Sequence, residues 1–172
     1  KPNAQTDWNA PASHTNQWQQ EMFEMIDRLR FYSCITTWVI FNEGWGQHNT
    51  VEIVEKVMEY DKSRIIDGVT GWTDRGVGHM YDVHNYPSAS NGNRISVLGE
   101  FGGYGWAIKE HLWNPGMRNW GYKNIDGAMA LMDNYGRLVY DLETLIAQGL
   151  SAAIYTQTTD VEGEVNGLIT YD

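Results

Sequence analysis

The chain has 172 residues, 42% of them hydrophobic, which is enough for one domain with a sizeable core. Its net charge is −10 at pH 7, and its Lys and Arg residues are scattered, which argues against nucleic acid or an anionic membrane as a partner. Cys34 is the single cysteine, so an intrachain disulfide is excluded. No apolar run reaches the length of a membrane span, so we expect a domain without a membrane partner.

Aromatic residues are frequent, with eight Trp and ten Tyr against four Phe. Trp and Tyr combine a flat apolar ring with one polar group, so they suit both a core and a cleft that holds the apolar faces of sugars. Composition fits both uses, and it leaves them open.

The first half of the chain alternates helix and strand. Residues 1–15 are polar, contain two prolines and predict an irregular lead-in. An apolar stripe predicts a helix over residues 16–33, and the apolar run at 35–42 is typical of a strand buried on both faces in a parallel sheet. A second helix is predicted after Gly46, with Asn49 and an acidic residue three positions later as its N-terminal cap.

The second half predicts four more strands and one long helix. The strands cover residues 65–67, 80–84, 95–100 and 152–156. The helix covers 128–146, where an apolar stripe that we assign to the core holds its period for about five turns. Before it lies an aromatic-rich loop at 101–126, a length that is uncommon and often functional. This alternation predicts an α/β protein with a mostly parallel sheet, whose functional groups gather at the carboxyl ends of its strands.

Two glutamates end two of the predicted strands, and each is followed by glycine. Glu43 follows the run at 35–42, and Glu100 ends the strand at 95–100. A carboxylate at the end of a buried strand is costly unless it has a partner or a chemical role. Glycoside hydrolysis needs two carboxyl groups at one anomeric carbon. The alternative is that each glutamate caps a helix or pairs with an arginine, and spacing leaves both interpretations open.

Three segments carry a family resemblance. They are residues 38–47 (WVIFNEGWGQ), 82–87 (DVHNYP) and 98–103 (LGEFGG). In this order and spacing they resemble the acid/base segment, an intervening strand and the nucleophile segment of glycoside hydrolase family 2, the β-galactosidase, β-mannosidase and β-glucuronidase family. The resemblance spans nearly all of residues 16–172.

The resemblance implies a partial (β/α)8 TIM barrel, with strands four to eight and their helices. Residues 1–172 would be one domain, the C-terminal portion of the catalytic barrel. Glu43 would be the general acid/base and Glu100 the nucleophile of a retaining double-displacement reaction on β-glycosides, with no cofactor and no metal ion. By family habit the protein would be secreted or periplasmic.

The resemblance also implies a sugar site around the two carboxyl groups. Asn42 would bond the sugar 2-hydroxyl, and Tyr86 would donate a hydrogen bond to Glu100. The other predicted substrate-binding residues are Trp45, His84, Trp106 and Tyr155. Tyr155 stands near the end of the last strand, where the family often carries Trp, so the preferred sugar stays open.

Two alternatives accompany this interpretation. No residues match the first three barrel strands, so we expect self-association or packing against those strands, and the fragment could be a carbohydrate-binding or scaffold piece without turnover. A second rival is a metallohydrolase whose ligands come from strand ends, although the spacing matches no strong zinc pattern. Its candidate ligands are His79, Asp82, His84 and Glu100.

Overall fold

A computed structural model describes residues 5–84 and 93–172 of the chain. By their contacts these residues divide into two compact units, the first formed by residues 5–84 and 93–97 and the second by 98–172. The boundary falls within one strand, β4 (Ile95–Gly102), which contributes residues to both units. This division does not test the prediction of a single domain, which stays a prediction.

The first unit alternates helices and strands. Its elements are α1 (Ala12–Leu29), β1 (Thr37–Asn42), α2 (Thr50–Tyr60), β2 (Ile65–Thr70), β3 (Met80–Val83) and the start of β4. β1 and β2 pair in parallel, in a register that runs from Thr37 opposite Ile65 to Asn42 opposite Thr70. The two strands therefore end side by side, as α/β connections through a helix require.

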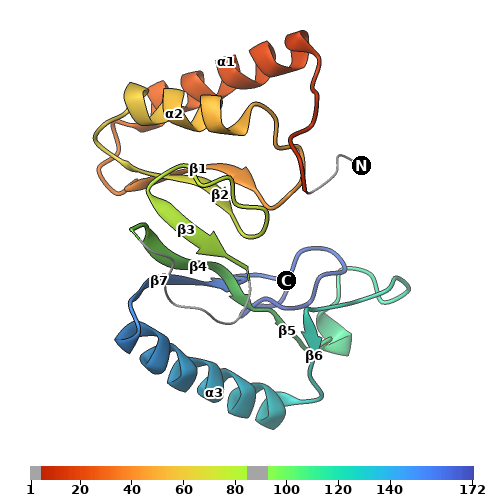
Figure 1. Ribbon diagram of the computed structural model, residues 1–172. Helices are drawn as coiled ribbons and strands as arrows, with labels where there is room; N and C mark the ends of the chain where they lie inside the picture. The colour runs from red at the N-terminus through yellow and green to blue at the C-terminus, as the bar shows by residue number, and fades with distance from the viewer. Residues whose placement is uncertain (1–4, 85–92) are drawn as a thin grey trace. The chain divides into compact units, whose positions relative to one another are not determined.

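The core of the first unit lies between its helices and the β1–β2 pair (Figure 1). Ile26 of α1, Val54 of α2 and Ile66 of β2 are fully buried there. The predicted helix over 16–33 exists, but it begins at Ala12 and ends at Leu29. The prediction that the first strand is buried on both faces is wrong, because Val39 is 52% exposed.

The N-terminus of α2 is held by the lead-in segment. Asn49 occupies the cap position, but its backbone is left-handed with φ 44°, and its side chain makes no capping hydrogen bond. Instead, the Asp7 carboxylate accepts hydrogen bonds from the Thr50 backbone N–H and from its hydroxyl, both at 2.8 Å. Arg75 also donates to Asp7, at 3.1 Å. The residues predicted as an irregular lead-in therefore supply the cap.

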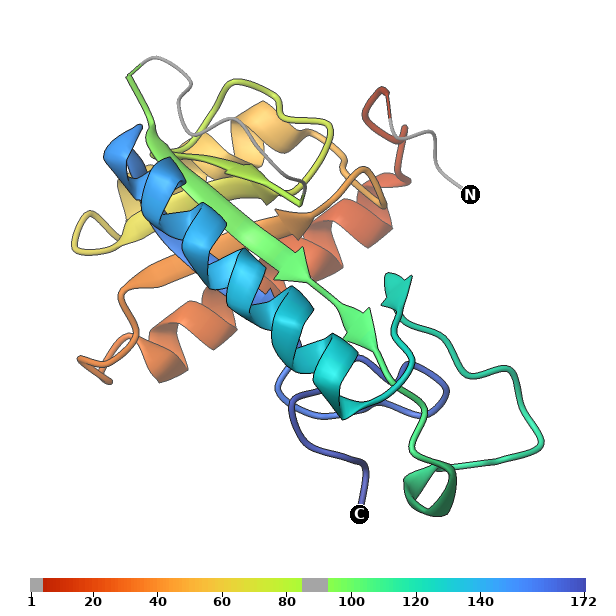
Figure 2. The same ribbon diagram turned by 90° about the horizontal axis from the view of Figure 1, so that it is seen from below.

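The second unit contains the rest of β4, two short strands, one long helix and a final strand. Its elements are β5 (Tyr104–Gly105), the 3-10 turn η1 (Lys109–His111), β6 (Lys123–Asn124), α3 (Ala128–Ala147) and β7 (Leu150–Thr156). β7 lies beside β4, β5 pairs with β6 in parallel, and α3 runs along β7 (Figure 2). The predicted loop at 101–126 thus contains short regular pieces, which backbone hydrogen bonds join.

The apolar stripe of α3 is only partly core. Leu138 and Leu145 are buried, as predicted. Met132, Val139 and Ile146 are 68%, 45% and 62% exposed, so the assignment of the whole stripe to the core is wrong. Exposed apolar side chains at this density fit the expected self-association, which stays a prediction.

Among the helices of the described residues, none combines the length and the apolar character needed to cross a bilayer.

The predicted partial TIM barrel is wrong. The described residues form a small mixed α/β structure with three helices and short parallel pairs, without the five strand–helix units that the prediction requires. The physical reason lies in the connections. Residues 71–79 join β2 to β3 without a helix, and β4 leads to α3 through short strands and loops. A barrel needs a helical crossover after each strand, and those crossovers take a dozen or more residues.

Candidate active site

Glu43 follows the last residue of β1, at the carboxyl end of the parallel pair. Its backbone is left-handed, with φ 55°, which is unfavourable for a residue with a Cβ. Two hydrogen bonds hold it there: the Glu43 N–H donates to the Thr70 carbonyl at 2.7 Å, and the Gln47 side-chain amide donates to the Glu43 carbonyl. The strand ends sharply, and the Glu43 side chain is aimed by a backbone that its neighbours fix.

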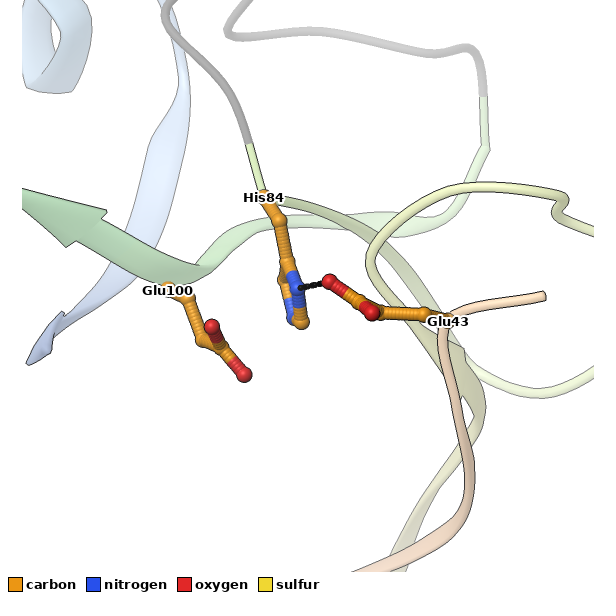
Figure 3. Close-up of side chains that lie close together, drawn as sticks. All are labelled: Glu43, His84 and Glu100. Atoms are coloured by element: carbon orange, nitrogen blue, oxygen red, sulfur yellow. Dashed lines mark hydrogen bonds and ion pairs between the residues drawn. The ribbon is translucent and has the colours of Figure 1, made fainter. Parts of the chain in front are cut away.

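Two ring nitrogens, from Trp45 and His84, hold the Glu43 carboxyl group. The Trp45 indole N–H donates to Oε2 at 3.1 Å, and the His84 Nδ1 lies 3.0 Å from Oε1 (Figure 3). The side chain of Glu43 is still 23% exposed, so the group is both oriented and accessible. A carboxyl group of this kind can give or take a proton at a bound molecule, which is the geometry that general acid–base catalysis requires.

His84 is itself fixed on both ring nitrogens. Its Nε2 lies 2.8 Å from the Thr70 hydroxyl, opposite the bond from Nδ1 to Glu43, and its side chain is only 5% exposed. The ring packs against Gly71, where an added Cβ would lie 2.8 Å from the imidazole. Since both nitrogens are engaged, His84 could ligate a metal only by giving up one of these bonds.

Glu100 lies in β4, and its partner in the second unit is an unexpected tyrosine. The strand continues to Gly102, so the prediction that it ends at Glu100 is wrong by two residues. The Tyr122 hydroxyl donates to Glu100 Oε2 at 3.0 Å. The Tyr122 ring lies directly over Gly103, where φ is +65° and any Cβ would collide with it. Tyr86, which we predicted as the donor to Glu100, lies outside the described residues.

The sequence carries only an indirect signal for Tyr122. The glycine pair after Glu100 indicates a close approach to the backbone, but the sequence does not say which ring approaches. Tyr122 is 22 residues away from Glu100, within the loop whose aromatic residues we could not tell apart. Its place became visible only with the hydrogen bond from its backbone N–H to the Gly103 carbonyl, at 2.8 Å.

Tyr155 and Trp106, the other predicted substrate-binding residues of the second unit, are half-buried. The Tyr155 ring lies over Gly102 and meets Phe101 edge-on at 5.7 Å. Burial raises the pKa of the Tyr155 hydroxyl above its usual value. The Trp106 backbone N–H donates to the carbonyl of Val165 at 3.0 Å. The Tyr155 ring therefore packs against its neighbours, and contact of either residue with a sugar stays a prediction.

Asn42 and Trp45 line a cavity of about 460 Å³ in the first unit. Its other walls are mostly aromatic and include Trp8 and His14 from the N-terminal segment, which sequence reasoning did not assign to any site. Trp45 also meets Trp72 edge-on at 5.1 Å. A larger cavity of about 980 Å³ opens at the amino ends of the strands, and Asn42, Glu43 and His84 are not among its lining residues. The smaller cavity is therefore lined by two close sequence neighbours of Glu43, namely Asn42 and Trp45, although Glu43 and His84 do not line it themselves.

Two further acids form a buried pair away from Glu43. Asp67 of β2 and Asp82 of β3 are 1% and 3% exposed. Burial, followed by the hydrogen bond and negative charge of Asp82, raises the pKa of Asp67 to about 8. The two carboxyl groups therefore share a proton at neutral pH. His79 Nδ1 accepts a hydrogen bond from the Ile66 N–H at 2.9 Å. The acid and the histidine that we considered as metal ligands thus have partners in β2.

Comparison with known proteins adds no family: no family model matches the sequence, and no curated protein matches it either.

Proposed function

We propose that the chain carries the two catalytic carboxyl groups of a retaining β-glycosidase, with Glu43 as general acid/base and Glu100 as nucleophile. One observation carries the proposal: Glu43 stands at the carboxyl end of a parallel strand, accessible, with one oxygen bonded to Trp45 and the other to His84. The resemblance of three ordered segments to family 2 glycoside hydrolases supports it independently.

The proposed reaction has two steps. Glu43 gives its proton to the glycosidic oxygen while a Glu100 carboxylate oxygen bonds the anomeric carbon, so the leaving alcohol departs neutral. Glu43, now ionised, then takes a proton from a water molecule. The oxygen of that water attacks the anomeric carbon, and the bond from this carbon to Glu100 breaks. Tyr122 donates to Glu100 Oε2 and would orient the attacking carboxylate. Asn42 would bond the sugar 2-hydroxyl from its position beside Glu43.

The proposed substrate class is a β-linked carbohydrate. Trp45 and Trp72 are 43% and 40% exposed, and the cavity beside Asn42 has aromatic walls. Half-exposed indole rings offer flat apolar faces next to polar groups, which is what the two sides of a sugar ring require. No step of the proposed reaction needs a cofactor.

Hydrolysis of aryl β-glycosides by the whole chain tests the proposal. We expect release of the β-anomer first, and we expect Glu100→Gln to abolish turnover. Glu43→Ala should keep turnover only for substrates with an activated leaving group such as dinitrophenol, because those need no acid. Glu143→Gln is the matched control, since Glu143 lies exposed on α3.

Azide separates the two roles. With Glu43→Ala it should attack the glycosyl-enzyme and give a β-glycosyl azide, whereas with Glu100→Ala it should give the α-product. Full activity in both glutamate variants, or first release of the α-anomer, would contradict the assignment. Sugar binding by the wild type without turnover of any substrate would instead support the carbohydrate-binding alternative.

A further inference from the structure

The Gln47 side chain joins two turns of the first unit. Its amide nitrogen donates to the carbonyl of Glu43, in the turn after β1, and to the carbonyl of Thr73, in the loop after β2, at 3.2 Å. Backbone carbonyls only accept hydrogen bonds, so the amide must point its nitrogen toward them. Gln47 is 1% exposed, and its own carbonyl accepts the Trp8 N–H at 2.6 Å. A buried and anchored side chain therefore connects the two turns.

Both carbonyls belong to residues with a left-handed backbone. The φ angle is 55° at Glu43 and 71° at Thr73. A positive φ is unfavourable for any residue with a Cβ, and most of all for a β-branched residue such as threonine. Such conformations persist only where the surrounding structure holds them. At Glu43 the Thr70 carbonyl fixes the N–H and Gln47 fixes the carbonyl, so the strained residue is held from both sides.

The same two turns carry the indole pair beside the proposed acid. Trp45 lies between Glu43 and Gln47 in the sequence, and its indole N–H donates to Glu43 Oε2. Trp72 directly precedes Thr73. The two indole rings meet edge-on at 5.1 Å. Because the Gln47 amide bonds a carbonyl in each turn, it also fixes how far apart these rings stand.

Packing alone does not account for a glutamine at this position. The Gln47 Oε1 is buried and has no hydrogen-bond partner among the described residues. An unpaired buried acceptor is unfavourable, and an apolar side chain of the same length, methionine, would avoid it. What glutamine offers here and methionine lacks is the pair of N–H donors.

We propose that Gln47 is a positioning residue of the candidate active site. Its amide holds Glu43 and Thr73 in their left-handed conformations, and thereby sets the direction of the Glu43 carboxyl group and the contact between Trp45 and Trp72. The consequence for catalysis rests on the proposed glycosidase function, whereas the conformational role does not.

NMR of the chain labelled with ¹³C and ¹⁵N tests the conformation, because the one-bond Cα–Hα coupling is smaller at positive φ than at negative φ. We expect the small coupling at Glu43 and Thr73 in the wild type. Gln47→Met should abolish it at both residues and weaken the nuclear Overhauser effects between the Trp45 and Trp72 rings. A small coupling that persists at either residue in Gln47→Met would overturn the inference.

A second variant and a control accompany this measurement. The carboxyl group of Gln47→Glu has one donor when protonated and none when ionised, so at least one of the two residues should lose its small coupling. This variant decides the question if Gln47→Met does not fold, and small couplings at both residues would again overturn the inference. Gln20→Met is the matched control, because Gln20 lies exposed on α1, and its couplings should equal those of the wild type.

Kinetics test the catalytic consequence. Gln47→Met should lower kcat/KM about tenfold or more for aryl glycosides with poor leaving groups, since a displacement of about 1 Å at a catalytic group can slow a reaction about a hundredfold. For dinitrophenyl glycosides kcat/KM should stay near the wild type, because that leaving group needs no acid. An equal loss on both substrates would contradict the positioning of Glu43. If the wild type hydrolyses no glycoside while the NMR result holds, the proposed function fails and the conformational role of Gln47 stands.

Discussion

The buried acid pair makes the first unit lose stability as the pH rises. The pKa of Asp67 is about 8 in the folded chain, against an ordinary value of 3.8. Between these values the unfolded state has lost the proton that the folded state still binds, so the free energy of unfolding falls with pH. Each pH unit well below the folded pKa is worth about 1.4 kcal/mol, and the slope halves at that pKa, so from pH 6 to pH 8 the wild type should lose roughly 2 kcal/mol through this group. The loss ends above the folded pKa.

Asp67→Asn should remove that slope. The amide is neutral at every pH, and its N–H₂ can donate to Asp82 as the shared proton does. Urea unfolding followed by Trp fluorescence at pH 5, 6, 7 and 8, at one ionic strength, measures the difference between variant and wild type. Asp133→Asn is the control, because Asp133 lies exposed on α3. Parallel pH dependences for the wild type and Asp67→Asn would refute the shared proton.

Three further outcomes follow from the contacts. Asp7→Ala should lower the free energy of unfolding by about 1 kcal/mol through the lost α2 cap, measured by urea midpoint. Gly71→Ala should cost about 1–3 kcal/mol, because φ there is +94° and the new Cβ meets the His84 ring; thermal unfolding measures it, and an unchanged midpoint would contradict the contact. Tyr122→Phe should lower kcat on aryl glycosides about tenfold or more, since Glu100 loses a donor, while the melting temperature stays near the wild type.

Local sequence patterns predicted the elements that local forces determine. The apolar period of residues 128–146 predicted the bounds of α3 to within one residue, because a long stripe of this period is compatible only with an α-helix. β1 and β3 appeared close to where their apolar runs indicated. The barrel prediction failed at the connections, because the resemblance supplied an architecture that residues 71–79 are too short and too rich in glycine to build.

In the candidate site, too, the residues in local motifs could be predicted from the sequence and those that act over a long sequence separation could not. Glu43, Trp45 and His84 belong to motifs, and their mutual hydrogen bonds in the first unit agree with a common role. Asp7 and Tyr122 belong to none. Asp7 acts across 43 residues, so no local pattern could reveal it, and Tyr122 stood among similar rings in one loop.

The cap from Asp7 also bears on the order in which the first unit folds. α2 has 11 residues, a length at which an isolated helix is marginal in water. Its first turn gains a side-chain partner only after a segment far back in the chain has docked, and that closure carries an entropic cost that grows with the intervening length. The rate of hydrogen exchange of the amide protons at the start of α2 should therefore depend on how often residues 5–11 undock, and not only on the opening of the helix itself. Cleavage of the chain within that segment should first cause fraying of the N-terminus of α2, more than forty residues away.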